Sequence, residues 1–392
     1  MEGHILVLNA GSSSLKFGLY EGASKPPAVR LRGQISSLSQ RPQFKVRDDQ
    51  GRSLCERRLE QNSGLSQAAA LDYVLDWLAE SAGAQTITAV GHRVVHGGMA
   101  HAEPVLLSPS LMAELRELVP LAPLHQPHNL AAIERIAERH PALPQVASFD
   151  TAFHRSNSEV VQRYALPEAL HQAGVRRYGF HGLSYAYIAG VLKDHDRRAA
   201  EGRTIVLHLG SGASLCALKG GVSVASSMGF SALDGLPMAS RCGALDPGVI
   251  LYLLQERGMS ADQVQDLLYQ QSGLLGLSGI SGDLQRLSES PSAQARLAID
   301  VFVNRIVREI GSLAAALGGL DALVFTAGIG EHSALVRAGV CEGLAWLGMR
   351  LDPGANAVHA ALISASDSQL LALVIATDEE SVIAADAARV LG

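Results

Sequence analysis

The chain has 392 residues, of which 47% are hydrophobic and 18% are charged, so it is long enough for two domains with a sizeable core. Its 32 basic and 38 acidic residues give a net charge of −6 without a basic stripe, which argues against nucleic acid or an anionic membrane as the main partner. The four cysteines form no CxxC pair, the N-terminus has no basic leader, and no apolar stretch approaches the length of a membrane span. We therefore expect an α/β protein that is soluble and cytoplasmic.

The first half of the chain alternates short apolar runs with amphipathic segments. Residues 4–9 predict a buried strand, the Gly/Ser-rich turn after it leads into a returning strand at 15–22, and residues 29–60 contain further short β segments. Apolar residues at helical spacing predict a helix over 65–82. Four further elements are predicted: a strand with a Gly-rich end at 88–98, helices at 110–118 and 128–139, and a strand at 144–150 that ends in an acid.

The second half opens like the first. Residues 203–221 again read as an apolar strand, a Gly/Ser turn and an apolar strand, and Val7 aligns with Val206 and Gly11 with Gly210. This pattern indicates an internal duplication, although a strand–turn–strand pattern is common. A long helix at 292–317, a strand, Gly turn and helix at 321–337, and a strand and closing helix at 371–391 follow. We expect two domains, 1–150 and 151–377, with the last helix (378–392) folding back onto the first.

The Gly/Ser turns could bind phosphate, because glycine lets backbone N–H groups approach phosphate oxygens closely. The chain has no GxxxxGK[ST] sequence, so it is not a P-loop protein, and no GxGxxG opens a βαβ unit. Any one of these turns alone is more simply a hairpin. Three in one chain, two of them duplicated, favour a nucleotide held between two similar halves.

A few polar residues stand out beside these turns and strand ends. Lys16, Arg93 and Arg241 could neutralise phosphate or carboxylate charge, or could form ordinary surface ion pairs. His125 and His181 lie in tight loops, where a histidine is usually structural, and no HExxH motif indicates zinc. Asp150 and Glu379 follow apolar strands and could either cap the next element or hold Mg²⁺.

Taken together, these segments resemble the acetate kinase family. The matching strings follow one another in order along almost the whole chain: LVLNAGSSSLKF at 6–17, GHRVVHGG at 91–98, APLHQPHN at 122–129, FDTAFH at 149–154, RRYGFHGLS at 176–184, HLGSGAS at 208–214, SMGFSALDGL at 227–236, RCGALDPG at 241–248, FTAGIGEHS at 325–333 and TDEE at 377–380. The resemblance implies a duplicated actin-like ATPase (ribonuclease H-like) fold, with two domains flanking a nucleotide cleft, and a homodimer. It also implies Mg²⁺-dependent, reversible transfer of a phosphoryl group from ATP to acetate, giving acetyl phosphate and ADP, with Mn²⁺ able to substitute for Mg²⁺.

The resemblance assigns roles residue by residue. Asn9 and Glu379 match metal-site residues, Asp150 the catalytic acid, and His125 an active-site histidine. Arg93 matches the arginine that binds the substrate carboxylate, whereas Arg241 and His181 match the residues that stabilise the transition state. The ATP contacts fall on Ser14 and Lys16 and on three later stretches: His208, Leu209, Gly210, Ser211 and Gly212; Asp283, Leu284 and Gln285; and Gly328, Ile329, Gly330, Glu331 and His332.

Some positions depart from the family's usual residues. Ser211 and Asp378 stand where asparagine is typical, Ala232 where proline is typical near the acyl pocket, and Gln285 where arginine is typical. The segment ASSMG at 225–229 also lacks an acid that the family usually carries. These departures predict an altered acyl or nucleotide preference, while the core set of residues is kept.

Acetate is ionised at pH 7, since carboxyl groups titrate near pH ~4, so it needs no base to become a nucleophile. Catalysis should therefore consist of charge neutralisation and in-line placement, and Asp150 should orient Mg²⁺ or its waters rather than move a proton. Val95 and Leu124, with Ala232, are candidate walls of a small acyl pocket. Two alternatives stay open: a propionate or butyrate kinase of the same family, and a non-catalytic actin-like or Hsp70-like nucleotide switch.

Overall fold

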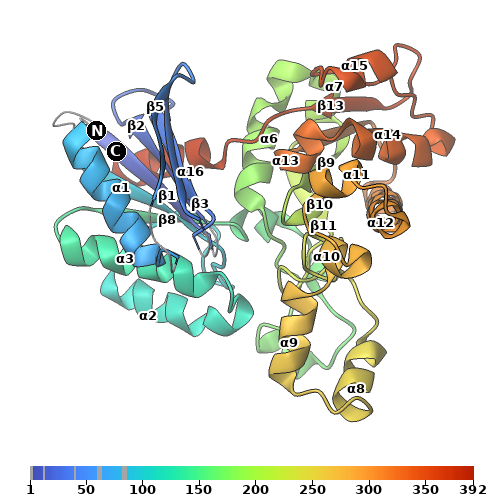
Figure 1. Cartoon of the computed structure of the whole chain (residues 1–392), viewed down its shortest axis with the longest axis horizontal. Helices are drawn as coiled ribbons and strands as arrows, with labels where there is room; N and C mark the ends of the chain where they lie inside the picture. Colours follow the sequence, from blue (N-terminus) through green and yellow to red (C-terminus); the bar gives the residue numbers. More distant parts are fainter. Residues whose placement is uncertain (1–2, 12–13, 39–40, 60–63, 82–85) are drawn as a thin grey trace. The chain divides into compact units, whose positions relative to one another are not determined.

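The computed structural model describes residues 3–11, 14–38, 41–59, 64–81 and 86–392. The chain divides into two compact units (Figure 1). Unit 1 comprises Met1–Phe153 together with Asp378–Gly392, and unit 2 comprises His154–Thr377. No helix in the described part of the chain is long and apolar enough to cross a membrane.

Unit 1 is built on an eight-stranded sheet with the order β5-β4-β3-β2-β1-β6-β8-β7. The strands β1 to β5 form an antiparallel meander, while β6 and β8 run parallel to β1. The strand bounds are β1 His4–Ala10, β2 Leu15–Glu21, β3 Ala28–Ser36, β4 Gln43–Asp48, β5 Ser53–Arg58, β6 Ile87–Val94, β7 Val105–Leu106 and β8 Gln145–Phe149.

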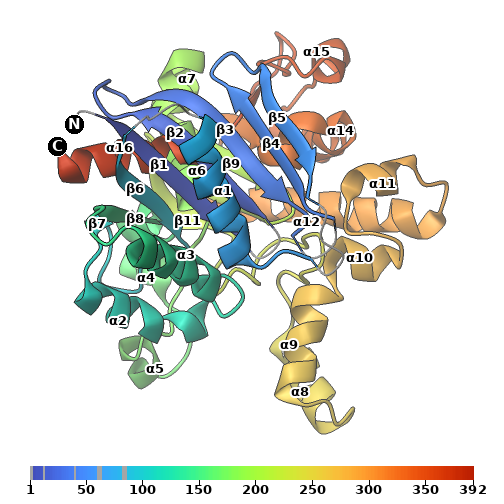
Figure 2. The ribbon, with the colours of Figure 1, turned by 60° about the vertical axis from the view of Figure 1, so that its left-hand side comes forward.

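Helices cover both faces of this sheet (Figure 2). Alternation along β1 turns Leu6 and Leu8 into a core that also contains Leu71 and Val74 of α1 (Gln67–Ser81). The helix α3 (Gln126–Arg139) lies beside α1, and α2 (Pro109–Glu117) beside α3. On the opposite face, the C-terminal helix α16 (Glu379–Leu391) packs against β1, β6 and β8, which places the start of α16 beside the ends of these strands.

Unit 2 is built on a five-stranded sheet with the order β11-β10-β9-β12-β13. Its strands are β9 Arg203–Leu209, β10 Ala213–Lys219, β11 Val222–Ser226, β12 Ala322–Thr326 and β13 Leu371–Val374. The long helix α12 (Ala293–Leu317) packs against β9, β10 and β11. The other helices are α4 Glu159–Gln162, α5 Glu168–Gln172, α6 Gly182–His195, α7 Arg197–Glu201, α8 Pro247–Gln255, α9 Ala261–Gln270, α10 Gly273–Ser278, α11 Leu284–Glu289, α13 Ala327–His332, α14 Ala334–Gly343 and α15 Pro353–Ala357.

The two sheets share one topology, which confirms the predicted duplication. The order β3-β2-β1-β6-β8 in unit 1 corresponds to β11-β10-β9-β12-β13 in unit 2. In both series the first three strands pair antiparallel and the last three pair parallel. The Gly/Ser turns that align in the sequence therefore occupy equivalent places, between the first two strands of each copy.

Most predicted elements agree with the structure to within a few residues, but one differs in kind. The Gly-rich segment after β12 was expected to be a turn, and it forms the short helix α13, whose first residue Ala327 has a positive φ of 63°. Glycine disfavours helix by about 1 kcal/mol per residue, and α13 contains two glycines, so the sequence predicted a turn there instead of a helix.

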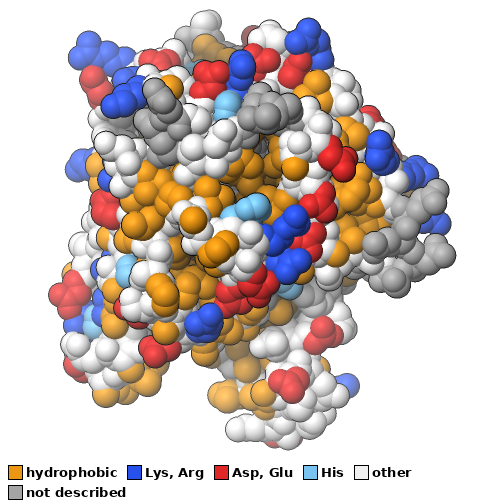
Figure 3. Space-filling view, turned by 90° about the vertical axis from the view of Figure 1, so that its left-hand side faces the viewer, with side chains coloured by type: hydrophobic (Ala, Val, Ile, Leu, Met, Phe, Trp, Pro, Cys, Tyr) orange, Lys and Arg blue, Asp and Glu red, His pale blue; other side chains and the backbone are white. Residues whose placement is uncertain are grey.

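On the face drawn in Figure 3, the described basic and acidic side chains are interspersed.

Candidate active site

Unit 1 brings five of its polar side chains together at the ends of β1, β6 and β8. Arg93 on β6 donates from Nε and Nη2 to the carboxylate of Asp150, at 3.0 and 2.5 Å to Oδ2, and from Nη1 to Asn9 Oδ1 at 3.2 Å. Asn9 Nδ2 in turn donates to Glu379 Oε2 at 3.3 Å and to Glu380 Oε1 at 3.4 Å, at the start of α16. Residues that are far apart in the sequence thus form one hydrogen-bonded cluster.

Burial makes the charges in this cluster strongly interdependent. Asp150 is almost fully buried and Arg93 nearly so. Burial by itself opposes the charge of the guanidinium, but the carboxylates of Asp150 and Glu379 outweigh that effect and raise the pKa of Arg93 above its ordinary value. Arg93 is therefore a fixed cation whose orientation Asp150 and Asn9 determine.

The oxygen donors near Asn9 fit a magnesium ion. Glu379 and Glu380 offer carboxylates beside the Asn9 amide, and hard cations prefer oxygen ligands. Among the described residues, no group of three or more His, Cys, Asp or Glu side chains is arranged to hold a metal. Mg²⁺ commonly uses one or two carboxylates and takes its other ligands from water and substrate phosphates. The carboxylates of Glu379 and Glu380 fit such a site.

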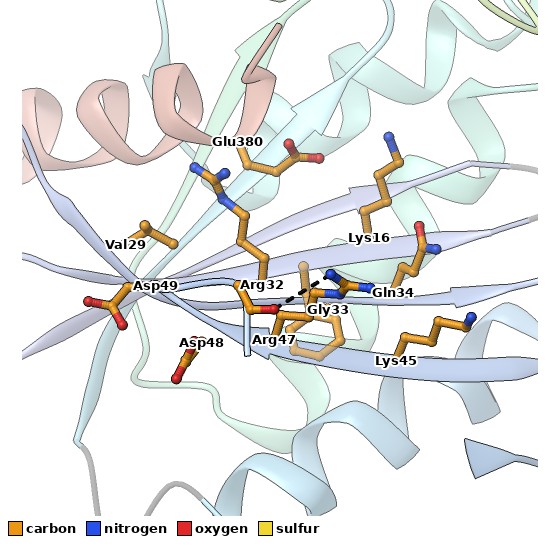
Figure 4. A pocket seen from close by; sticks show the side chains of 12 residues that line it. Lys16, Val29, Arg32, Gly33, Gln34, Lys45, Arg47, Asp48, Asp49 and Glu380 are labelled. Carbon is orange, nitrogen blue, oxygen red and sulfur yellow. Dashed lines mark hydrogen bonds between the residues drawn. The ribbon is translucent and has the colours of Figure 1, made fainter. Parts of the chain in front are cut away.

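The predicted phosphate contacts of unit 1 lie on the β1–β2 hairpin. Ser14 closes the turn by accepting the Gly11 N–H through its carbonyl at 2.9 Å, whereas Ser12 and Ser13 lie outside the described residues. Lys16 is exposed on β2 and lines a pocket of about 610 Å³. In that pocket Lys16, Gln34 and Lys45 lie side by side across β2, β3 and β4 (Figure 4). Lys16 is thus in a position to meet an anion.

The loop after β6 is tied to the start of α3. The Val95 N–H donates to Asn129 Oδ1 at 3.0 Å, and Gln126 exchanges two hydrogen bonds of 3.1 Å with the backbone of His96. Asn129 also donates to the Ala10 carbonyl at 2.7 Å, which links this loop to the β1–β2 turn. Leu124 and His125 are half-buried directly before α3, and His125 occupies its N-cap position. Val95, Leu124 and His125 therefore belong to one connected region.

Unit 2 brings Arg241 and His181 together at Gly212. A Cβ atom built on Gly212 would lie 3.1 Å from Arg241 Nη2 and 3.1 Å from His181 Nε2, so a larger residue there would make these side chains shift by a few tenths of an ångström. Arg241 Nη1 also donates to the Ala232 carbonyl at 2.7 Å. The structure thus joins the three predicted positions Arg241, His181 and Ala232 around the turn between β9 and β10.

The predicted nucleotide stretches adjoin this turn. His208 at the end of β9 pairs with Thr326 at the end of β12, directly before the α13 segment Gly328–His332. The Ala239 N–H donates to the Ser211 carbonyl at 3.2 Å, and a Cβ on Gly282 would lie 2.6 Å from the Ala239 carbonyl. The stretch Asp283–Gln285 therefore also lies near, with Asp283 as the N-cap of α11.

Comparison with known proteins identifies the family to which this architecture belongs. The model of the acetokinase family matches residues 4–385. The acetate kinase of Rhodopseudomonas palustris (strain ATCC BAA-98 / CGA009) is 54% identical over 385 residues, which cover 97% of this chain and 96% of that protein. The acetate kinase of Nitrobacter hamburgensis is 50% identical over 381 residues, covering 97% and 94%. The chain belongs to the acetokinase family.

Solved structures of the acetokinase family support the same conclusion. The propionate kinase from Francisella tularensis superposes with a TM-score of 0.89 at 34% identity, covering 98% of each chain. The acetate kinase from Porphyromonas gingivalis superposes with a TM-score of 0.86 at 35% identity over the whole of both chains. The predicted fold, a duplicated actin-like ATPase fold, is confirmed. So is the enzyme class, a kinase that transfers phosphate from ATP to the carboxylate of acetate.

Sequence reasoning missed a buried arginine, Arg337, that supports this acetokinase-family site. Arg337 on α14 is fully buried, and its Nη1 donates to the carbonyls of Gly330 and Glu331 in α13 at 2.9 and 2.8 Å. Its Nε donates to Asn356 Oδ1 at 2.7 Å. Burial lowers the pKa of Arg337 from its ordinary value. One sequence signal could have identified Arg337 as buried: it stands in the string SALVR, among apolar residues at helical spacing.

Proposed function

We propose that the chain catalyses direct, in-line phosphoryl transfer from ATP to acetate, giving acetyl phosphate and ADP, and that the residues assigned above carry the reaction. The observation that supports this most strongly is the convergence of Arg241 and His181 on Gly212, beside the stretches expected to bind the nucleotide. The two units would be the two domains of this enzyme.

Arg93 would bind the carboxylate of acetate. Asp150 engages Nε and Nη2 side-on and Asn9 accepts one hydrogen of Nη1, so Nη1 and Nη2 each keep one further N–H that could bind a second carboxylate end-on. Asp150 would thus orient the Arg93 guanidinium directly and would not take part in proton transfer. This role differs from the orientation of Mg²⁺ expected from the sequence, and it follows from the bidentate geometry.

Arg241 and His181 would stabilise the negative charge on the transferring phosphoryl group, because positioned donors act where charge develops. Ser14, Lys16, the His208–Gly212 turn, the Asp283–Gln285 segment and the α13 segment would hold the nucleotide. Glu379 would hold Mg²⁺, or Mn²⁺ in its place, and Asn9 would position the Glu379 carboxylate by donating to it from Nδ2. When bound, the ion would neutralise phosphate charge.

The substrate test is a comparison of kcat/KM for acetate, propionate and butyrate, with acyl phosphate trapped as the hydroxamate. Val95, Leu124 and Ala232 would form a small acyl pocket, and one methylene is worth about 1–3 kcal/mol in such a pocket. We expect acetate to be preferred, with propionate as a slower substrate. A butyrate optimum would contradict the proposal, and ATP hydrolysis that is indifferent to carboxylates would instead indicate a nucleotide switch.

We further propose that the protein is a homodimer in the cytoplasm. The helix α8 carries Val249, Leu251, Tyr252 and Leu254, which are all exposed in the single chain. Exposed apolar side chains gathered on one short helix favour an interaction site, and a second copy of the chain would cover them. Light scattering of Leu251→Lys should show a monomer where the wild type is a dimer. A wild-type monomer would refute this assembly.

A further inference from the structure

We propose that Tyr185 and Ser214 are positioning residues that keep His181 in the tautomer with its proton on Nε2, so that the imidazole can donate a hydrogen bond. This inference rests on the proposed role of His181 in phosphoryl transfer. It concerns side chains that lie wholly within unit 2, on α6 and β10.

The three side chains form a continuous hydrogen-bonded chain. His181 Nδ1 lies 2.7 Å from Ser214 Oγ, and the Tyr185 hydroxyl lies 2.5 Å from the same oxygen. Tyr185 follows His181 by four residues, so both side chains come from one face of the start of α6 and reach Ser214 at the start of β10. Ser214 and Tyr185 are both fully buried.

The order of proton donation follows from the chemistry of the three groups. We assign the Tyr185 phenol as the donor to Ser214 Oγ, 2.5 Å away, because burial raises the pKa of Tyr185 well above its ordinary value and the phenol keeps its proton. A serine hydroxyl has one proton, which Ser214 then donates to His181 Nδ1. The remaining proton of a neutral imidazole must therefore be on Nε2.

The surroundings of His181 favour the neutral ring as well as this tautomer. His208, on β9, stacks on His181 with ring centroids 4.1 Å apart, and Arg241 Nη2 lies on the same side of Gly212 as His181 Nε2, each 3.1 Å from the position of a Cβ atom there. Both are basic groups, and a positive charge on either disfavours an imidazolium at residue 181. Tyr185 is a further titratable group beside it, joined to it through Ser214. The Nε2 atom points toward the same space as Arg241 Nη2. A hydrogen-bond donor there would stabilise the oxygens of the transferring phosphoryl group, whereas an acceptor would repel them.

His208 has an analogous anchor, which indicates that fixing the ring nitrogens is a recurring device here. Its Nδ1 lies 2.9 Å from Ser184 Oγ, and Ser184 Oγ lies 2.9 Å from Thr377 Oγ1. Two stacked imidazoles are thus each held at Nδ1 by a serine hydroxyl. The proposal concerns the tautomer of His181, because Tyr185 sets which group donates the proton in the hydrogen-bonded chain that ends at His181 Nδ1.

The experiment combines kinetics with nitrogen NMR of protein labelled on histidine, with the His181 signals assigned from the spectrum of His181→Asn. In the wild type we expect Nε2 of residue 181 to carry the proton at pH 7.5. Tyr185→Phe and Ser214→Ala should shift the ring toward a mixture of tautomers and lower kcat by about 10–100-fold, the range typical of lost supporting hydrogen bonds, with KM for ATP and acetate changed less. Ser214→Thr, which keeps the hydroxyl, should retain the wild-type tautomer.

Tyr178→Phe is the matched control. Tyr178 is also a buried tyrosine of unit 2, and its hydroxyl donates to the Gly174 carbonyl at 2.8 Å, outside the His181 chain. This variant should lose comparable stability while kcat and the His181 spectrum stay unchanged. The proposal is overturned if wild-type His181 carries its proton on Nδ1, or if Tyr185→Phe behaves like Tyr178→Phe. Because NMR reads the tautomer without turnover, this outcome is distinguishable from a failure of the proposed reaction.

Discussion

Arg241 Nη2 and His181 Nε2 each lie 3.1 Å from the position that a Cβ atom of residue 212 would occupy. That distance is shorter than ordinary van der Waals contact, so a methyl group there must displace one or both side chains. The approach of these two groups, and not a positive φ, therefore favours glycine at residue 212.

Gly212→Ala should shift Arg241 or His181 by a few tenths of an ångström and lower kcat by about 10-fold, less than the about 10²-fold that a misplacement of about 1 Å can cost. Steady-state kinetics with ATP and acetate provides the measurement. Gly311→Ala is the control, since residue 311 lies within α12 and a Cβ there meets nothing within 4 Å. That control should keep full activity and gain about 0.5–1 kcal/mol of stability. Full activity in Gly212→Ala would refute the convergence as a functional requirement.

Arg241→Lys tests whether the planar guanidinium is needed at this position. A lysine ammonium cannot both hold the Ala232 carbonyl and present a second donor toward phosphate in the same plane. A transition-state arginine is worth about 10³–10⁵ in rate, so we expect turnover to fall by about 10³-fold while the protein stays folded. The exposed Arg257, changed to lysine, should show no effect. Near-normal kcat in Arg241→Lys would exclude the role.

Asp150→Asn separates orientation of Arg93 from proton transfer. Removing one partner of a buried ion pair typically costs about 3–5 kcal/mol, and the loosened guanidinium should raise KM for acetate much more than KM for ATP. Denaturant titration measures the loss in the free energy of unfolding, and kinetics at varied acetate and ATP concentrations measure the two KM values. Asp76→Asn, at an exposed pair with Arg139, should cost less than about 1 kcal/mol. If Asp150 moved a proton, kcat would instead lose one limb of its pH profile with KM for acetate unchanged.

Much of the fold was predictable because its signals are local. The apolar run of β1, the turn after it and the repeat at β9 lie within short windows, and the parallel neighbours follow from the duplication. The candidate residues at strand ends could be found for the same reason. Asn9 is the second-last residue of β1 and Asp150 directly follows β8, and the ends of parallel strands meet at one edge of a sheet.

What the sequence could not show is which side chains support the candidate residues. Ser214 is 33 residues from His181, and Asn129 is 119 residues from the Ala10 carbonyl that it contacts. Such pairings depend on the register of strands and helices, which no local window contains. Asp378 is a further example. It looked like a departure from the family's asparagine, and it caps α16 through Ser381 N–H and forms an ion pair with Arg32 on β3.

The ion pair between Asp321 and Arg203 makes the stability of unit 2 depend on pH. Asp321, directly before β12, accepts the Arg203 backbone N–H and two guanidinium bonds, each at 2.9 Å. The Arg203 hydrogen bonds lower the pKa of Asp321 to about 2. A carboxyl whose folded pKa lies below its unfolded value of about 3.9 stabilises the fold above that value, and the stabilisation is lost as the pH falls toward 2.

Asp321→Asn should therefore lower the free energy of unfolding by about 1 kcal/mol at pH 7, and the gap to the wild type should narrow between pH 5 and pH 2. Urea titrations at pH 7, 5, 4 and 3 measure it. Asp300→Asn removes an exposed helical pair with Arg296 and should stay within about 0.5 kcal/mol of the wild type at every pH. A gap for Asp321→Asn that is the same at pH 7 and pH 3 would mean that the lost backbone hydrogen bond, and not the charge, accounts for the effect.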